Sequence, residues 1–93
     1  DYPISRELLH WESQSNTTQE SETGKNLIHH MDRGYAILIF ARATKKRNNI
    51  TFPFTYLGPA NRVSYESERP IKVVWQLQYP MPADMFEENR RGG

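Results

Sequence analysis

The sequence predicts an α+β fold built on a small, mostly antiparallel sheet of about five strands that is curved or barrel-like. One short helix in the N-terminal half and a C-terminal helical turn complete the prediction. The clearest observation is residues 71–79, where apolar and polar side chains alternate as they do in a half-buried strand. The other apolar segments are mostly short and β-rich, and their connections have hairpin length. A helix start signal followed by apolar residues at helical spacing occurs at residues 17–31.

The strand over residues 71–79 places five apolar side chains on one face and polar ones on the other. The apolar residues are Ile71, Val73, Trp75, Leu77 and Tyr79. Pro80 and Pro82 then end the strand, because proline cannot donate to a sheet ladder. Residues 83–88 follow as a helical turn, with Met85 and Phe86 packed inward.

Four further strands are expected, in residues 8–13, 35–43, 52–56 and 62–66. The segment 35–43 is apolar on both alternating faces, so we expect it to be covered on both sides and central in the sheet. Residues 45–49 supply a polar turn with two asparagines, which tolerate left-handed backbone. A second turn is expected at Gly58-Pro59.

The helix of residues 17–31 is expected to open with a capping box. Thr17 is followed three residues later by Glu20, the spacing that lets two side chains satisfy each other's backbone N–H groups. Leu27, Ile28 and Met31 then share one side of the helix. This side is expected to pack on the sheet.

The 93 residues predict one domain, with a core over 5–86 and a frayed end over 87–93. Eleven aromatic residues make disorder throughout the chain unexpected, and the lack of cysteine excludes disulfides and a thiol nucleophile. The longest apolar run, 36–41, is too short to span a bilayer, so no membrane partner is expected. Because the chain opens with Asp1 instead of methionine, we expect it to be a piece of a larger protein.

The net charge of +1 hides a local asymmetry. Residues 1–24 contain five acids and one base, whereas residues 25–47 contain six bases and one acid. The basic middle of the chain is a candidate surface for an anionic partner. A solvated rim is the alternative, and charge alone favours that alternative.

Motifs of self-contained catalysis are missing from the sequence. It contains no glycine-rich phosphate loop and no G-x-S-x-G nucleophile elbow. His29 and His30 point about 100° apart on a regular helix, so at most one of them joins His10 at a metal, and we disfavour that site. The carboxylate pairs 66/68 and 87/88 are explained equally well as wet acidic surface. We therefore expect no enzyme activity, cofactor or metal in this chain alone.

A binding surface remains as the hypothesis. Lys45, Lys46 and Arg47 lie at a hairpin, where long basic side chains reach phosphates. Trp11 precedes a polar loop and is a candidate for stacking on a base, with core packing as a nearly equal alternative. Trp75 is the weaker candidate because it shares the expected core face. The candidates for DNA contact are Trp11, Ser13, Gln14, Ser15, Lys25, Arg42, Lys45, Lys46 and Arg47.

Several segments, in this order, carry a resemblance to a known family. They are residues 10–15 (HWESQS), 23–30 (TGKNLIHH), 34–42 (GYAILIFAR), 56–59 (YLGP) and 68–77 (ERPIKVVWQL). Together they resemble a bacterial family of C-terminal domains once catalogued as of unknown function. In that family the domain follows a phospholipase-D-type nuclease and a superfamily-two helicase motor in one polypeptide. The resemblance covers nearly all of residues 5–86.

The resemblance implies a target-recognition domain of a type IV, modification-dependent restriction endonuclease. Such a domain senses methylated or hydroxymethylated cytosine in double-stranded DNA, in the bacterial cytoplasm. Nuclease and motor activity would belong to upstream domains of the same polypeptide. The alternative is a structural or dimerisation module of a helicase-nuclease, with no DNA contact of its own. Which modification is recognised, and whether the base is flipped, stay open at this point.

Overall fold

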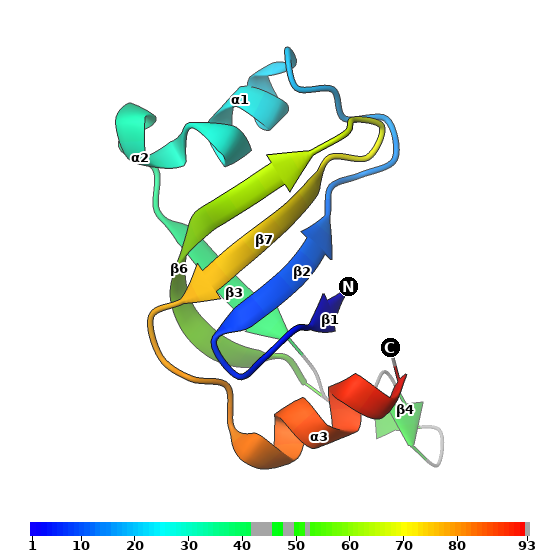
Figure 1. The fold of residues 1–93 in the computed structure, drawn as a ribbon. Helices are drawn as coiled ribbons and strands as arrows, with labels where there is room; N and C mark the ends of the chain where they lie inside the picture. Colours follow the sequence, from blue (N-terminus) through cyan, green and yellow to red (C-terminus); the bar gives the residue numbers. More distant parts are fainter. Residues whose placement is uncertain (42–45, 48–49, 52, 93) are drawn as a thin grey trace.

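The computed structural model describes residues 1–41, 46–47, 50–51 and 53–92. It confirms the α+β fold: five antiparallel strands form one sheet that curls into a half-barrel (Figure 1). The strand order is β1 (Tyr2–Pro3), β2 (Leu8–Glu12), β7 (Lys72–Leu77), β6 (Thr55–Glu66) and β3 (Ile37–Ala41). Helices α1 (Glu22–Ile28) and α2 (His30–Arg33) lie at one end of the sheet, and α3 (Ala83–Gly92) lies at the other. A two-stranded ribbon pairs β4 (Lys46–Arg47) with β5 (Ile50–Thr51).

Strand β7 is the centre of the sheet and carries the core. Val73, Trp75 and Leu77 are at most 3% exposed, and Ile71 just before the strand is fully buried. The alternation seen in the sequence is therefore confirmed. Tyr79 departs from it at 58% exposed, because the strand ends at Leu77 and the alternation stops there.

Strand β3 lies at the edge of the sheet, so its predicted central position is wrong. Among the described residues it pairs with β6 alone. Ile39 on its inner side is buried, whereas Leu38 and Phe40 on its outer side are more than half exposed. The apolar pattern on both faces arises because one face lines the interior and the other forms an exposed apolar surface.

The predicted turn at Gly58-Pro59 is also wrong, since both residues lie inside β6, which runs unbroken over twelve residues. The pairing of β6 with β3 shifts register between Ile39 and Phe40, and Gly58 there adopts a φ of +100°. A second register shift occurs against β7 between Arg62 and Ser64. Such irregularities increase local twist, so the glycine allows β6 to bend and the sheet to curl where a reversal was expected.

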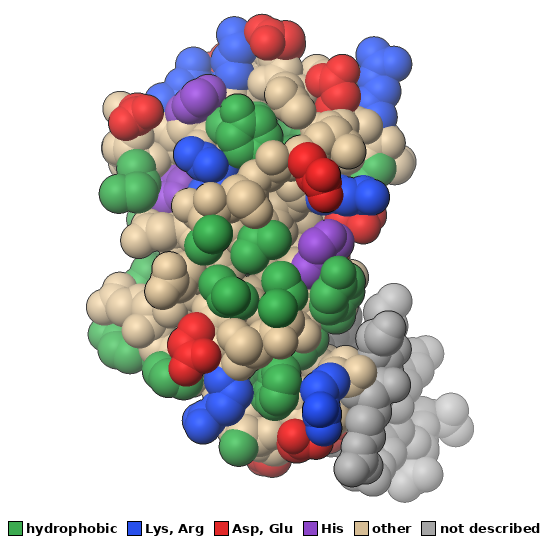
Figure 2. Space-filling view, viewed as in Figure 1, with side chains coloured by type: hydrophobic (Ala, Val, Ile, Leu, Met, Phe, Trp, Pro, Cys, Tyr) green, Lys and Arg blue, Asp and Glu red, His purple; other side chains and the backbone are tan. Residues whose placement is uncertain are grey.

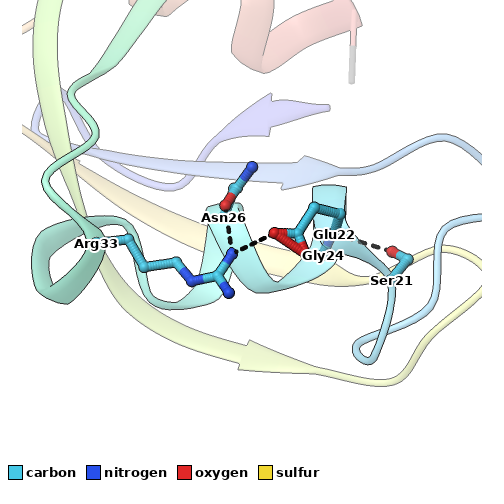
Figure 3. Close-up of polar contacts among 5 residues, drawn as sticks. All are labelled: Ser21, Glu22, Gly24, Asn26 and Arg33. Carbon is cyan, nitrogen blue, oxygen red and sulfur yellow. Dashed lines mark hydrogen bonds and ion pairs between the residues drawn. The ribbon is translucent and has the colours of Figure 1, made fainter.

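The helical segment begins later than predicted and is broken in two. Ser21 caps α1, because its Oγ accepts a hydrogen bond from the N–H of Gly24 at 3.0 Å (Figure 3). The capping box at Thr17 is therefore wrong. The guanidinium of Arg33 in α2 donates to Oε1 of Glu22 at 3.0 Å and to Oδ1 of Asn26, which ties the two helices together (Figure 3).

The two helices bury only part of the expected apolar side. Ile28 is 3% exposed and Leu27 packs against the core, as predicted. Met31 is 69% exposed, because the break at His29 turns it away from the side that Leu27 and Ile28 share.

Helix α3 starts directly after Pro82 and continues to Gly92. Met85 and Phe86 pack against the core, which confirms their predicted inward orientation. The helix also contacts β1 at the edge of the sheet. Within the described ranges, no helix has the length and apolar character needed to cross a membrane.

Candidate nucleic-acid-binding site

A cavity of about 700 Å³ lies inside the half-barrel, between its two edges. Strands β1 and β2 form one wall, β3 forms the opposite wall, and Trp75 of β7 lies between them in the sheet order. Outside the strands, the cavity is also lined by Asp1, Leu27, Ala36, Phe54, Met81 and Asn89. The cavity exists because the sheet curls far enough to bring β1 and β3 around a common interior without closing.

Two tryptophans line this cavity, and they are the only two in the chain. Trp11 on β2 and Trp75 on β7 have ring centroids 6.2 Å apart and planes inclined by 58°. Trp75 is 1% exposed, and the ring of His30 contacts it edge-on at 5.6 Å. Trp11 is half-buried and packs against the core. Both roles weighed for Trp11 are thus compatible with its position, because it is a core neighbour and a cavity wall at once.

The polar loop after Trp11 divides into an inward and an outward part. Ser13 is buried, and its Oγ accepts a hydrogen bond from the N–H of Ile71 at 2.9 Å and donates to the carbonyl of Gln14 at 3.1 Å. Its hydroxyl therefore joins the end of β2 to the start of β7. Gln14 and Ser15 are exposed and remain available for a partner.

Among the predicted basic residues, Lys25 lies apart from Lys46 and Arg47. Lys25 lies on α1, at the opposite end of the sheet from β4 (Figure 1). Arg42 and Lys45 lie outside the described residues, as do the side chains of Lys46 and Arg47, whose backbone forms β4. On the face shown in Figure 2, lysine and arginine side chains alternate with acidic ones, so the described residues form no continuous basic band there.

The basic segment of residues 42–47 nevertheless lies close to the cavity, because it directly follows β3 in the chain. Ala41 lines the cavity at the end of β3, and Lys46 follows five residues later. Five residues span at most about 18 Å. The backbone of Lys46 therefore lies within that distance of the cavity wall.

His30 and His10 contact neighbouring residues of the fold, whereas His29 is exposed. His30 is 3% exposed; its Nδ1 lies 3.1 Å from the carbonyl of Tyr35, and its Nε2 accepts a hydrogen bond from the N–H of Arg62 at 3.3 Å. His10 stacks on Tyr2 with centroids 4.6 Å apart. Within the described part of the chain, no three histidine or acidic side chains are grouped so that they could hold a metal ion.

Sequence reasoning missed most of the cavity lining. Trp75 was only the weaker candidate, and Phe54, Asp1 and Asn89 were not candidates, although all four line the cavity. The sequence feature closest to a signal was the segment 35–43, which is apolar on both faces. That pattern does not distinguish a strand beside a cavity from a strand covered on both faces.

A comparison with family models identifies the family. The model described as a domain of unknown function, DUF3427, matches residues 1–89. The comparisons with curated proteins and with solved structures gave no match.

Proposed function

The chain belongs to the DUF3427 family of domains of unknown function, and from its cavity we propose that it recognises DNA by taking in a single modified cytosine. The observation that carries the proposal is the aromatic-lined cavity inside the half-barrel, whose wall strand β3 leads directly into a basic segment. A cavity of about 700 Å³ lies within the range of small-ligand sites.

The lining suits a base that carries an apolar substituent. Trp11 is half-buried and offers an aromatic face, with buried Trp75 packed behind it, and stacking of one base on an aromatic side chain contributes about 1–3 kcal/mol. A methyl group buried among Leu9, Ile39 and Met81 would add about 0.8 kcal/mol, a few-fold in affinity. The isolated domain is therefore expected to prefer methylated DNA modestly.

The position of the cavity requires the base to leave the duplex. Trp75 is buried and the cavity lies inside the curled sheet, so a base held within the double helix cannot reach it. Extrusion of one base from the stack costs a few kcal/mol. The basic side chains of residues 42–47 are the candidates that offset this cost through sequence-independent phosphate contacts.

The biological setting of the proposal comes from the family resemblance. We place the domain at the C-terminal end of a type IV restriction endonuclease of the bacterial cytoplasm, with nuclease and helicase domains upstream. In that setting the chain itself contributes recognition of methylated or hydroxymethylated cytosine, and the upstream domains contribute cleavage and ATP hydrolysis.

A cavity-filling substitution tests the proposal. Ala41 lines the cavity and is half-buried, so Ala41→Phe places a ring inside it. Val63→Phe, at an exposed position of β6, adds the same ring outside the cavity and serves as the control. Fluorescence anisotropy with duplexes that carry one 5-methylcytosine or one cytosine should show a few-fold preference in the parent and in Val63→Phe, and none in Ala41→Phe. A preference that survives in folded Ala41→Phe contradicts the proposal.

One observation favours the alternative of an interaction or dimerisation module. Leu38, Phe40 and Tyr56 are each more than half exposed on β3 and β6, where Leu38 and Phe40 also border the cavity, and the rings of Phe40 and Tyr56 lie 5.0 Å apart. Exposed apolar edge strands are ready templates for pairing with another chain. Under this alternative, Phe40→Lys abolishes self-association in sedimentation equilibrium, whereas DNA binding is absent from the parent as well.

A further inference from the structure

The cavity also contains two polar side chains that are candidates for discriminating cytosine from thymine. Resting on the proposed function, we infer that Asp1 and Asn89 recognise the polar edge of the captured base and select a cytosine-type edge. Among the described residues that line the cavity, these are the only two with polar, hydrogen-bonding amide or carboxylate side chains. Asp1 and Asn89 are therefore the specificity-determining residues of the proposed site.

An apolar cavity alone cannot perform this selection. Thymine carries the same methyl group at the same ring position as 5-methylcytosine, so stacking and methyl burial favour both bases equally. The two bases differ at their polar edge. Cytosine presents an amino donor at N4 beside an acceptor at N3, whereas thymine presents an acceptor at O4 beside an N–H donor. Discrimination must come from polar groups of the cavity.

Asp1 supplies the acceptor that cytosine requires. Its Oδ1 accepts a hydrogen bond from the backbone N–H of Glu12 at 3.0 Å, which fixes the carboxylate to the end of β2. A carboxylate has two oxygens, so this bond leaves Oδ2 for a ligand. Oδ2 would accept from the N4 amino group of cytosine and would repel O4 of thymine, because both are acceptors.

Asn89 supplies the complementary donor from the facing helix. Its Nδ2 donates to the carbonyl of Met85 at 2.9 Å, one turn earlier in α3, which holds the amide in place. An amide nitrogen carries two hydrogens, so the second is available for the N3 or O2 acceptor of cytosine. Helix α3 contacts β1, which begins directly after Asp1, and this brings the two side chains to the same cavity.

Three duplexes that differ at one base test the inference. They carry 5-methylcytosine, cytosine or thymine opposite an abasic site, so that none of the three bases has a pairing partner to lose on extrusion. The thymine duplex is the most demanding competitor, because it keeps the methyl group. We expect the parent chain to bind the 5-methylcytosine duplex about tenfold more tightly than the thymine duplex, the scale of one well-placed base contact.

Asp1→Asn keeps an acceptor for the N–H of Glu12, so the fold is retained, and it should reduce that tenfold preference to about twofold or less. Asn89→Leu should reduce it in the same direction. Asp32→Asn removes the same charge from exposed α2 and serves as the matched control, with the preference unchanged. An unchanged preference in Asp1→Asn, with thermal unfolding like that of the parent, overturns the inference. Equal binding of the 5-methylcytosine and thymine duplexes by the parent also overturns it, whereas equal binding of the 5-methylcytosine and cytosine duplexes overturns the proposed function.

Discussion

Replacement of Ser13 by alanine separates a structural hydroxyl from a DNA-contacting one. Ser13 is buried, and its Oγ is the acceptor for the N–H of Ile71, a residue with no exposed surface. Ser13→Ala leaves that N–H buried without its partner, which costs about 1–3 kcal/mol. The chain has about 5–14 kcal/mol of stability in total, on a per-residue basis. The substitution therefore removes a large share of it.

Thermal unfolding followed by circular dichroism measures the effect. For a domain of this size, a loss of about 2 kcal/mol lowers Tm by roughly 8–16 °C. Ser15→Ala is the matched control, because Ser15 is exposed in the same loop and its loss should stay within about 0.5 kcal/mol. A Ser13→Ala chain with parental Tm and a lost preference for 5-methylcytosine would refute the structural role and restore Ser13 as a base contact.

Three further substitutions follow from the same contacts. His30→Leu leaves the carbonyl of Tyr35 and the N–H of Arg62 without their partner, so the free energy of unfolding measured in urea should fall by about 2 kcal/mol or more. His29→Leu, at an exposed position, should change this free energy little. Gly24→Ala would normally favour a helix, but its Cβ would overlap the carbonyl oxygen of Thr18, so the substitution should lower Tm, and a raised Tm would contradict the packing around α1. Joint replacement of Lys45, Lys46 and Arg47 by alanine should weaken the binding of modified and unmodified duplexes alike. The slope of log affinity against log salt concentration should become less steep by about 0.9 for each lost phosphate contact. An unchanged slope would show that these side chains do not contact DNA.

The sequence was sufficient to predict a strand and its core residues where the alternation of apolar and polar residues matches the burial of the side chains. Strand β7 alternates strictly and is covered on one face, so its core residues from Ile71 to Leu77 were identified correctly. The place of β3 in the sheet was not predictable in this way. A strand that lines a cavity and exposes Leu38 and Phe40 has the same apolar pattern as a strand covered on both faces. Only the pairing partners distinguish the two cases.

The candidate site was predictable only in part, for a related reason. Trp11 was found because it precedes a polar loop, but its nearness to Trp75 depends on the pairing of β2 with β7 across more than sixty residues of chain. Asp1 and Asn89 come to one cavity only because the sheet curls and α3 packs beside β1. That curl depends on the bend at Gly58, which the sequence presented as a turn.

The entry of a modified base into the cavity is the central claim, and the two tryptophans report on it directly. Both line the cavity and no other tryptophan is present, so the ¹⁵N-labelled chain gives two indole N–H signals in an NMR spectrum. Titration with a duplex that carries one 5-methylcytosine should shift both signals, and an unmodified duplex at equal saturation should shift them less. Indole signals that stay in place while the methylated duplex binds would contradict the account.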